Sequence, residues 1–213
     1  KKSVLLWVAC GIIGALAYFA KAYAFPFFIL NTLVCTYFIC KDNKALWLKS
    51  ALTAILVMIA CSLPWIMALH DKYHIWTTST SGSLNMSWYL VGHPYWKQGI
   101  NLLIHPFYPD SPYYWEDPYW VNGATPHFWD SWQLFGRQLL RIIQNLYKLT
   151  ISMAQLSLFF PLIAFMTLGF INRKRKSTPD ASFIASISFF LFPFGYILVN
   201  FEARYIWYML PLG

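Results

Sequence analysis

Two adjacent carboxylates, Glu116 and Asp117, stand in an aromatic segment, Tyr113-Tyr-Trp-Glu-Asp-Pro-Tyr-Trp120. Aromatic rings pack against the C–H faces of sugars, and a carboxylate beside them can orient a hydroxyl group or accept its proton. Glu116 and Asp117 are therefore candidate catalytic residues. A structural explanation is also open, because Asp before Pro is a common turn signal and aromatic residues gather at membrane interfaces.

A lysine and a Glu–Arg pair stand at the edges of apolar stretches. Lys21 separates two long apolar runs, and Glu202 and Arg204 precede the last one. Ionisable side chains in or beside a membrane segment are costly unless they are paired or functional. Glu202 and Arg204 could simply neutralise each other. The interpretation we favour is a pocket in which Lys21 and Arg204 bind a phosphate group at the depth of the lipid headgroups.

Two arginines stand four residues apart in a segment with helical periodicity. Apolar residues recur at three- and four-residue steps between about 128 and 147, which predicts an amphipathic helix along a membrane surface. Arg137 and Arg141 would point the same way and could bind a lipid phosphate together. Alternatively, they reach lipid headgroups of any kind, as arginines on interfacial helices do. The predicted apolar face comprises Phe128, Trp132, Phe135, Leu139, Ile143 and Leu146.

The sequence gives weaker support for metal binding. His70 and His74 are four residues apart, as zinc ligands on a helix can be, and Asp71 stands beside them, but a clear third ligand is missing. We favour histidines that form hydrogen bonds or lie at a membrane interface. No cofactor is therefore predicted, and a divalent metal stays open as an alternative.

The composition is that of an integral membrane protein. Of the 213 residues, 58% are hydrophobic and 11% are charged, a combination that water-soluble domains rarely have. The net charge of +8 is interpreted through its distribution along the chain, and we expect no nucleic-acid partner. We predict an all-α protein, a polytopic bundle of transmembrane helices. The predicted spans lie at about 4–20, 25–40, 50–68, 149–171 and 181–199, with a sixth that begins at Ile206.

The chain divides into three parts by composition. Residues 1–69 hold three spans, residues 70–148 form an aromatic-rich loop that includes the amphipathic helix, and residues 149–213 hold two spans and the start of a sixth. Lysines and arginines gather in the connections on the opposite side from this loop, so the positive-inside rule makes the loop non-cytoplasmic. We expect an internal piece of a multi-pass protein of a bacterial inner membrane, in contact with membrane lipids.

Three short motifs resemble the GT-C membrane glycosyltransferases, the superfamily of protein O-mannosyltransferases and aminoarabinose transferases. The run Gly14-Ala-Leu-Ala-Tyr-Phe-Ala-Lys21-Ala-Tyr is similar to their lysine-bearing hairpin. Glu202-Ala-Arg204-Tyr205-Ile-Trp-Tyr-Met-Leu-Pro211 resembles their Arg-Tyr-aliphatic-Pro segment. Residues 77–92 are similar to the stretch that follows the membrane exit in bacterial members.

The resemblance implies transfer of a sugar from a polyprenyl-phosphate donor on the non-cytoplasmic face, with the general base in a loop upstream of Lys1. The expected substrate-binding residues are Lys21, Glu202, Arg204, Tyr205, Arg137 and Arg141. Two other classes stay open. A transporter or flippase would use helices broken by proline around a midplane site. A membrane assembly protein would bind another protein through the exposed aromatic surface.

Overall fold

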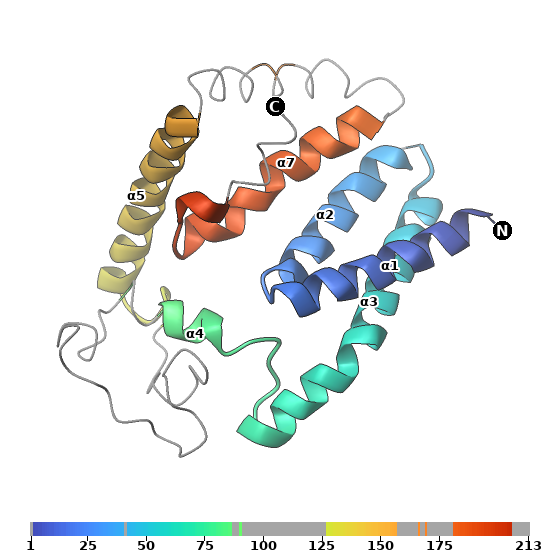
Figure 1. Cartoon of the computed structure of the whole chain (residues 1–213), viewed down its shortest axis with the longest axis horizontal. Coiled ribbons are helices and arrows are strands. Elements are labelled where there is room, and N and C mark those ends of the chain that lie inside the picture. The colour runs from blue at the N-terminus through green and yellow to red at the C-terminus, as the bar shows by residue number, and fades with distance from the viewer. Residues whose placement is uncertain are drawn as a thin grey trace. The chain divides into compact units, whose positions relative to one another are not determined.

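The computed structural model describes residues 2–40, 42–86, 90, 127–156, 166, 169 and 181–205. These residues form helices and turns and no strand, which confirms the all-α prediction for the part of the chain described (Figure 1). They divide into two compact units. The first unit comprises residues up to 78 with 152–195, and the second comprises residues 79–151 with 196–205.

Helices α1 (Lys2–Ala20) and α2 (Ala24–Ile39) form the predicted hairpin in the first unit. Both helices are almost wholly apolar in sequence, so neither has a polar face of its own to turn toward water. The turn between them occupies residues 21–23, and Lys21 is exposed there. The sequence therefore located the hairpin and its tip correctly.

Two glycines of α1 allow close approach of neighbouring helices. A Cβ atom at Gly14 would lie 2.6 Å from the ring of Phe28 on α2. A Cβ atom at Gly11 would lie 2.5 Å from the carbonyl oxygen of Ala54 on α3 (Lys44–Tyr73). Any larger residue at either position would force these helices apart.

Helix α3 is longer than the span predicted at 50–68. The side-chain oxygen of Asn43 caps its first turn and accepts a hydrogen bond of 3.0 Å from the amide of Leu46. Pro64 lies inside the helix and does not end it. The helix ends at His74, whose φ of 57° is the left-handed conformation typical of helix C-caps. His74 therefore leaves the helical face that it was predicted to share with His70.

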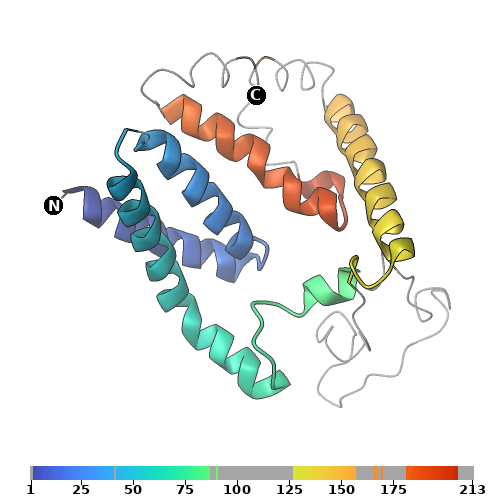
Figure 2. The same cartoon turned by 180° about the vertical axis from the view of Figure 1, so that it is seen from behind.

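Helix α7 (Ala181–Leu198) runs alongside α2 in the first unit (Figures 1 and 2). The two helices share an apolar core whose buried members are Cys35, Phe183 and Ile187. One polar contact crosses this interface, where the hydroxyl of Ser188 donates a hydrogen bond of 3.0 Å to the side-chain oxygen of Asn31. Such a bond between apolar helices helps to fix their register.

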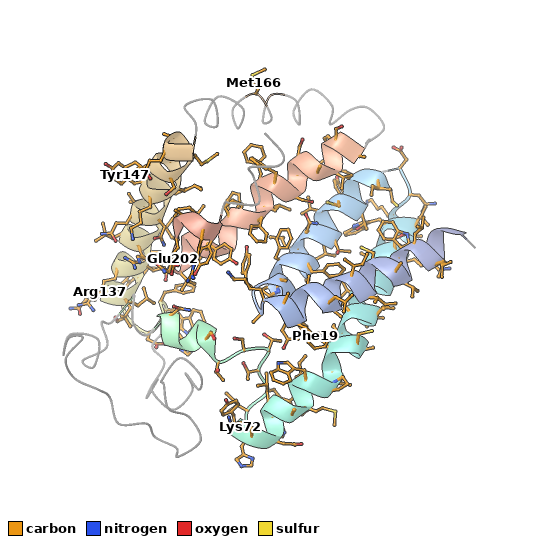
Figure 3. All side chains as sticks on the ribbon, in the orientation of Figure 1. Phe19, Lys72, Arg137, Tyr147, Met166 and Glu202 are labelled. Atoms are coloured by element: carbon orange, nitrogen blue, oxygen red, sulfur yellow. The ribbon has the colours of Figure 1, made fainter. Side chains whose placement is uncertain are left out.

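Helix α5 (Trp132–Leu156) is amphipathic, as predicted, and lies in the second unit up to residue 151. Its apolar face is exposed, with exposed fractions of 87% for Trp132, 63% for Ile143 and 67% for Tyr147. In Figure 3, Tyr147 extends from the side of α5 opposite to that on which Glu202 lies. Because α5 continues to Leu156, the predicted surface helix and the first residues of the predicted span 149–171 belong to one helix.

Among the residues that the structure describes, two helices, α3 and α7, are long and apolar enough to cross a membrane. The apolar stretches Val4–Ala20 and Ala24–Ile39 are shorter. Within the most apolar 18 residues of α3 and α7, only 17% and 28% are buried, whereas a core helix of a soluble protein would be mostly buried. These two helices therefore support membrane association, and a multi-pass arrangement stays a prediction.

Candidate functional site

The candidate site is the segment that follows α7, residues 199–205, which we call the exit segment. It carries three of the predicted substrate-binding residues, Glu202, Arg204 and Tyr205. The exit segment ends in a short 3₁₀ turn at residues 203–205, in which the amide of Tyr205 donates a hydrogen bond of 2.9 Å to the carbonyl oxygen of Glu202. This turn brings the side chains that follow α7 close together.

Helix α5 caps the last turn of α7 with polar side chains. The side-chain nitrogen of Asn145 donates a hydrogen bond of 2.9 Å to the carbonyl oxygen of Ile197. The side-chain nitrogen of Gln138 donates a hydrogen bond of 2.5 Å to the carbonyl oxygen of Leu198. Nε of Arg141 donates to the carbonyl oxygen of Val199 at 3.4 Å. The final carbonyl groups of a helix have no partner within it. Asn145 and Gln138 bind two of these groups, and Arg141 binds the carbonyl of the first residue of the exit segment.

Glu202 holds Arg204 at the surface of the second unit. Oε2 of Glu202 lies 2.6 Å from Nε of Arg204, and Oε1 accepts a hydrogen bond of 3.3 Å from the side-chain amide of Asn200. The Arg204 side chain keeps 64% of its surface exposed. Glu202 raises the pKa of Arg204 above its ordinary value, so the guanidinium group is charged at every physiological pH. The site therefore presents a cation that is oriented but accessible.

Tyr205 adds an aromatic wall to this site. Its ring stacks on that of Tyr196 with centroids 4.1 Å apart and an interplanar angle of 19°. The Arg204 guanidinium lies 5.6 Å from the centroid of the Tyr205 ring, within the range of a cation–π contact. Burial, and next the charge of Glu202, raise the pKa of Tyr205, so its hydroxyl stays neutral and able to donate a hydrogen bond.

The predicted arginine pair of α5 has two different sets of contacts. Nη1 of Arg137 donates to the carbonyl oxygen of Leu90 at 3.2 Å. Arg141 reaches Val199, and its Nη1 donates to the side-chain oxygen of Gln144 at 3.3 Å. Arg141 is thereby joined to the exit segment, whereas Arg137 contacts another part of the second unit. Joint binding of one phosphate by these arginines stays a prediction.

The remaining predicted residues lie elsewhere in the chain. Lys21 belongs to the first unit, in the turn between α1 and α2. Glu116 and Asp117 lie outside the described residues. Nδ1 of His70 lies 3.8 Å from Oδ1 of Asp71 and its ring stacks on Trp76, a pattern that needs no metal. Within the described ranges, no group of three or more His, Cys, Asp or Glu side chains could hold a metal ion.

Sequence reasoning missed two residues that shape this site, Gln138 and Asn145. Both are buried, with exposed fractions of 7% and 0%. The sequence contains one sign of this role, because the two side-chain amides are seven residues apart and therefore lie on one face of the helix, away from its apolar face.

No family model, curated protein or solved structure matches this chain.

Proposed function

We propose that this chain belongs to a multi-pass membrane glycosyltransferase of the GT-C type. It would move a sugar from a polyprenyl-phosphate donor to an acceptor on the non-cytoplasmic side. The observation that carries the proposal is the accessible Arg204 guanidinium, which Glu202 orients just beyond the end of α7. A cation at the end of an apolar helix lies at the depth at which a lipid phosphate would be found.

The exposed apolar surfaces support the membrane setting of this proposal. Helices α3 and α7 are long and apolar enough to span a bilayer, and much of their surface is uncovered within the chain. The apolar face of α5 is also exposed. We propose that this face lies in the boundary between headgroups and acyl chains, next to the lipid-linked donor.

The proposed reaction needs a cation at the leaving group. The acceptor oxygen attacks the anomeric carbon of the sugar, the bond from that carbon to the phosphate oxygen breaks, and polyprenyl phosphate leaves with the bonding electrons. Arg204 would stabilise the negative charge on the departing phosphate. Lys21 stays a second candidate for this role on the resemblance alone. A carboxylate would accept the acceptor proton, and Glu116 and Asp117 are the candidates that this sequence contains.

Glu202 would orient Arg204 without preventing phosphate binding. An ion pair as exposed as this one contributes ~0–1 kcal/mol, because water screens both charges. The donor phosphodiester, with one negative charge, can therefore share Arg204 with Glu202 at little cost. The departing polyprenyl phosphate gains a second charge, so its interaction with Arg204 is stronger. The hydroxyl of Tyr205, which is hydrogen-bonded to Arg204 and Glu202, would help to hold the guanidinium in place for the donor phosphate.

Substitution of the two cations tests this proposal. Transfer from a polyprenyl-linked sugar should fall at least about tenfold in Arg204→Ala and in Lys21→Ala, because each change removes a charge–phosphate interaction worth more than ~1.4 kcal/mol. Arg204→Lys should retain part of the activity.

Lys44→Ala is the matched control, because Lys44 is an exposed cation at the predicted cytoplasmic end of α3. Normal transfer in both alanine variants, at normal protein levels, would contradict the proposal, and flux of a solute into proteoliposomes would favour a transporter.

A further inference from the structure

Four consecutive carbonyl groups, those of residues 196–199 at the end of α7 and the start of the exit segment, each accept a hydrogen bond. The amide of Val199 donates to Tyr196 at 3.3 Å within the backbone. The next three carbonyls, from Ile197 to Val199, are bound by Asn145, Gln138 and Arg141 of α5. The donors for these three come from a helix more than fifty residues earlier in the chain, not from the helix itself or from solvent.

Asn145 also fixes the backbone beyond the helix. Its side-chain nitrogen donates to the carbonyl oxygen of Ile197, and its side-chain oxygen accepts a hydrogen bond of 3.4 Å from the amide of Phe201. The side chain thus bridges positions four residues apart, the interval that a helical hydrogen bond would span. It takes the place of a helical turn at the point where α7 stops.

Because Asn145 and Gln138 are buried, their hydrogen bonds favour a single conformation of the backbone at residues 197–201. Asn145 is fully buried and Gln138 almost so. A buried amide that loses its partner cannot exchange it for water, so a shift of the exit segment by one residue would leave amides and carbonyls unsatisfied together. Phe201, which is 3% exposed, is fixed at the same place. It directly precedes Glu202, so its position sets where the Glu202–Arg204 pair begins.

We infer that Gln138 and Asn145 are positioning residues, which hold the exit segment in the one path that lets Glu202 orient Arg204. Neither side chain touches the ion pair. Both act through the backbone of residues 197–201. The consequence for donor binding rests on the proposed function, whereas the consequence for the backbone does not.

Hydrogen–deuterium exchange tests the backbone part of this inference. In Asn145→Leu, and in Gln138→Met as a milder change, amides of residues 199–205 should exchange at least about tenfold faster than in the wild type. Peptides from α1, α2 and α3 should exchange as before, which shows that the first unit is folded. Gln133→Leu is the matched control, because Gln133 is an exposed glutamine of the same helix. Wild-type exchange of residues 199–205 in Asn145→Leu would overturn the inference.

Transfer kinetics test the functional part separately. Gln138→Met should raise the KM for the polyprenyl-linked donor about tenfold and also lower kcat, because the misplaced cation binds the donor phosphate and stabilises the departing one. A loss of folded protein would lower the maximal rate and leave KM unchanged, and that result would overturn the positioning role in donor binding. The two claims can fail separately. If the variants exchange faster but the wild-type protein transfers no sugar, the backbone inference is supported and the proposed function is contradicted.

Discussion

The hydroxyl group of Tyr23 donates a hydrogen bond of 2.6 Å to the carbonyl oxygen of Phe192, 169 residues further along the chain. The hydroxyl oxygen of Tyr23 in turn accepts a hydrogen bond of 3.1 Å from the amide of Gly195. Pro193 lies between these two residues inside α7, and a proline has no amide hydrogen to continue the helical ladder. The turn that carries Lys21 is thereby bound to α7 at its proline.

We predict that Tyr23→Phe destabilises the first unit by about 1–3 kcal/mol, because a partly buried amide and carbonyl lose their partner. The change should appear as a lower midpoint of thermal unfolding in detergent. Tyr37→Phe is the control, because the Tyr37 side chain is more than half exposed. Equal midpoints for the two variants would show that the hydroxyl of Tyr23 contributes no stability.

We predict opposite effects for two glycine-to-alanine changes. Gly11→Ala should lower the free energy of unfolding by about 1–3 kcal/mol, because its new methyl group meets the backbone of Ala54. Gly136→Ala should raise it by about 0.5–1 kcal/mol, since Gly136 lies in α5 with open space around it and alanine favours helix. Denaturant unfolding in mixed micelles measures both. A neutral Gly11→Ala would mean that α1 and α3 can separate freely.

We predict that the apolar face of α5 contacts lipid. Nitroxide labels at Trp132→Cys and Ile143→Cys, with the four native cysteines replaced by alanine, should collide more with oxygen than with a water-soluble nickel chelate. A label at Lys148→Cys should show the reverse, because Lys148 is an exposed polar position of the same helix. Electron paramagnetic resonance in proteoliposomes measures these collisions. Preferential nickel contact at positions 132 and 143 would place this face in water.

We predict that Tyr205 ionises above pH 10, its ordinary pKa, because burial and the Glu202 charge raise the pKa of its hydroxyl. Below pH 10 the group is neutral in the folded and unfolded states and does not affect stability. As the pH rises from 10 toward the folded-state pKa, only the unfolded state loses the proton, so stability falls. The phenolate absorbance of the wild type minus that of Tyr205→Phe gives the midpoint. A midpoint at or below 10 would contradict this environment.

Apolar runs predicted most of the helices, because a helix of apolar residues is the simplest way to satisfy the backbone where water is scarce. The expected span at 181–199 corresponds to α7, and those at 4–20 and 25–40 correspond to α1 and α2. Helix α3 extends beyond the expected span 50–68 at both ends. A single proline removes one hydrogen bond, and the residues on both sides of it continue the helix to Tyr73.

The candidate site was only partly predictable. The charges at the end of an apolar run indicated Glu202 and Arg204 as site residues. The sequence left open whether the two side chains pair, and the distance of 2.6 Å between them shows that they do. The spacing of Gln138 and Asn145 places them on one face of α5, but a polar face on an amphipathic helix is normally interpreted as facing solvent, so spacing alone does not identify them as site residues. Only the hydrogen bonds to α7 show that these amides are turned inward.

Three side chains of α5 bind the end of α7 and the exit segment, so the number of residues between these side chains matters for the candidate site. Each residue added to an α-helix rotates the remainder of that helix by about 100°. An insertion or deletion between positions 138 and 145 would swing Asn145 away from Ile197 and Phe201 while Gln138 stayed in place. We therefore expect related sequences to differ between positions 138 and 145 by substitutions, mostly on the outward face of α5. Insertions and deletions should not occur in this stretch.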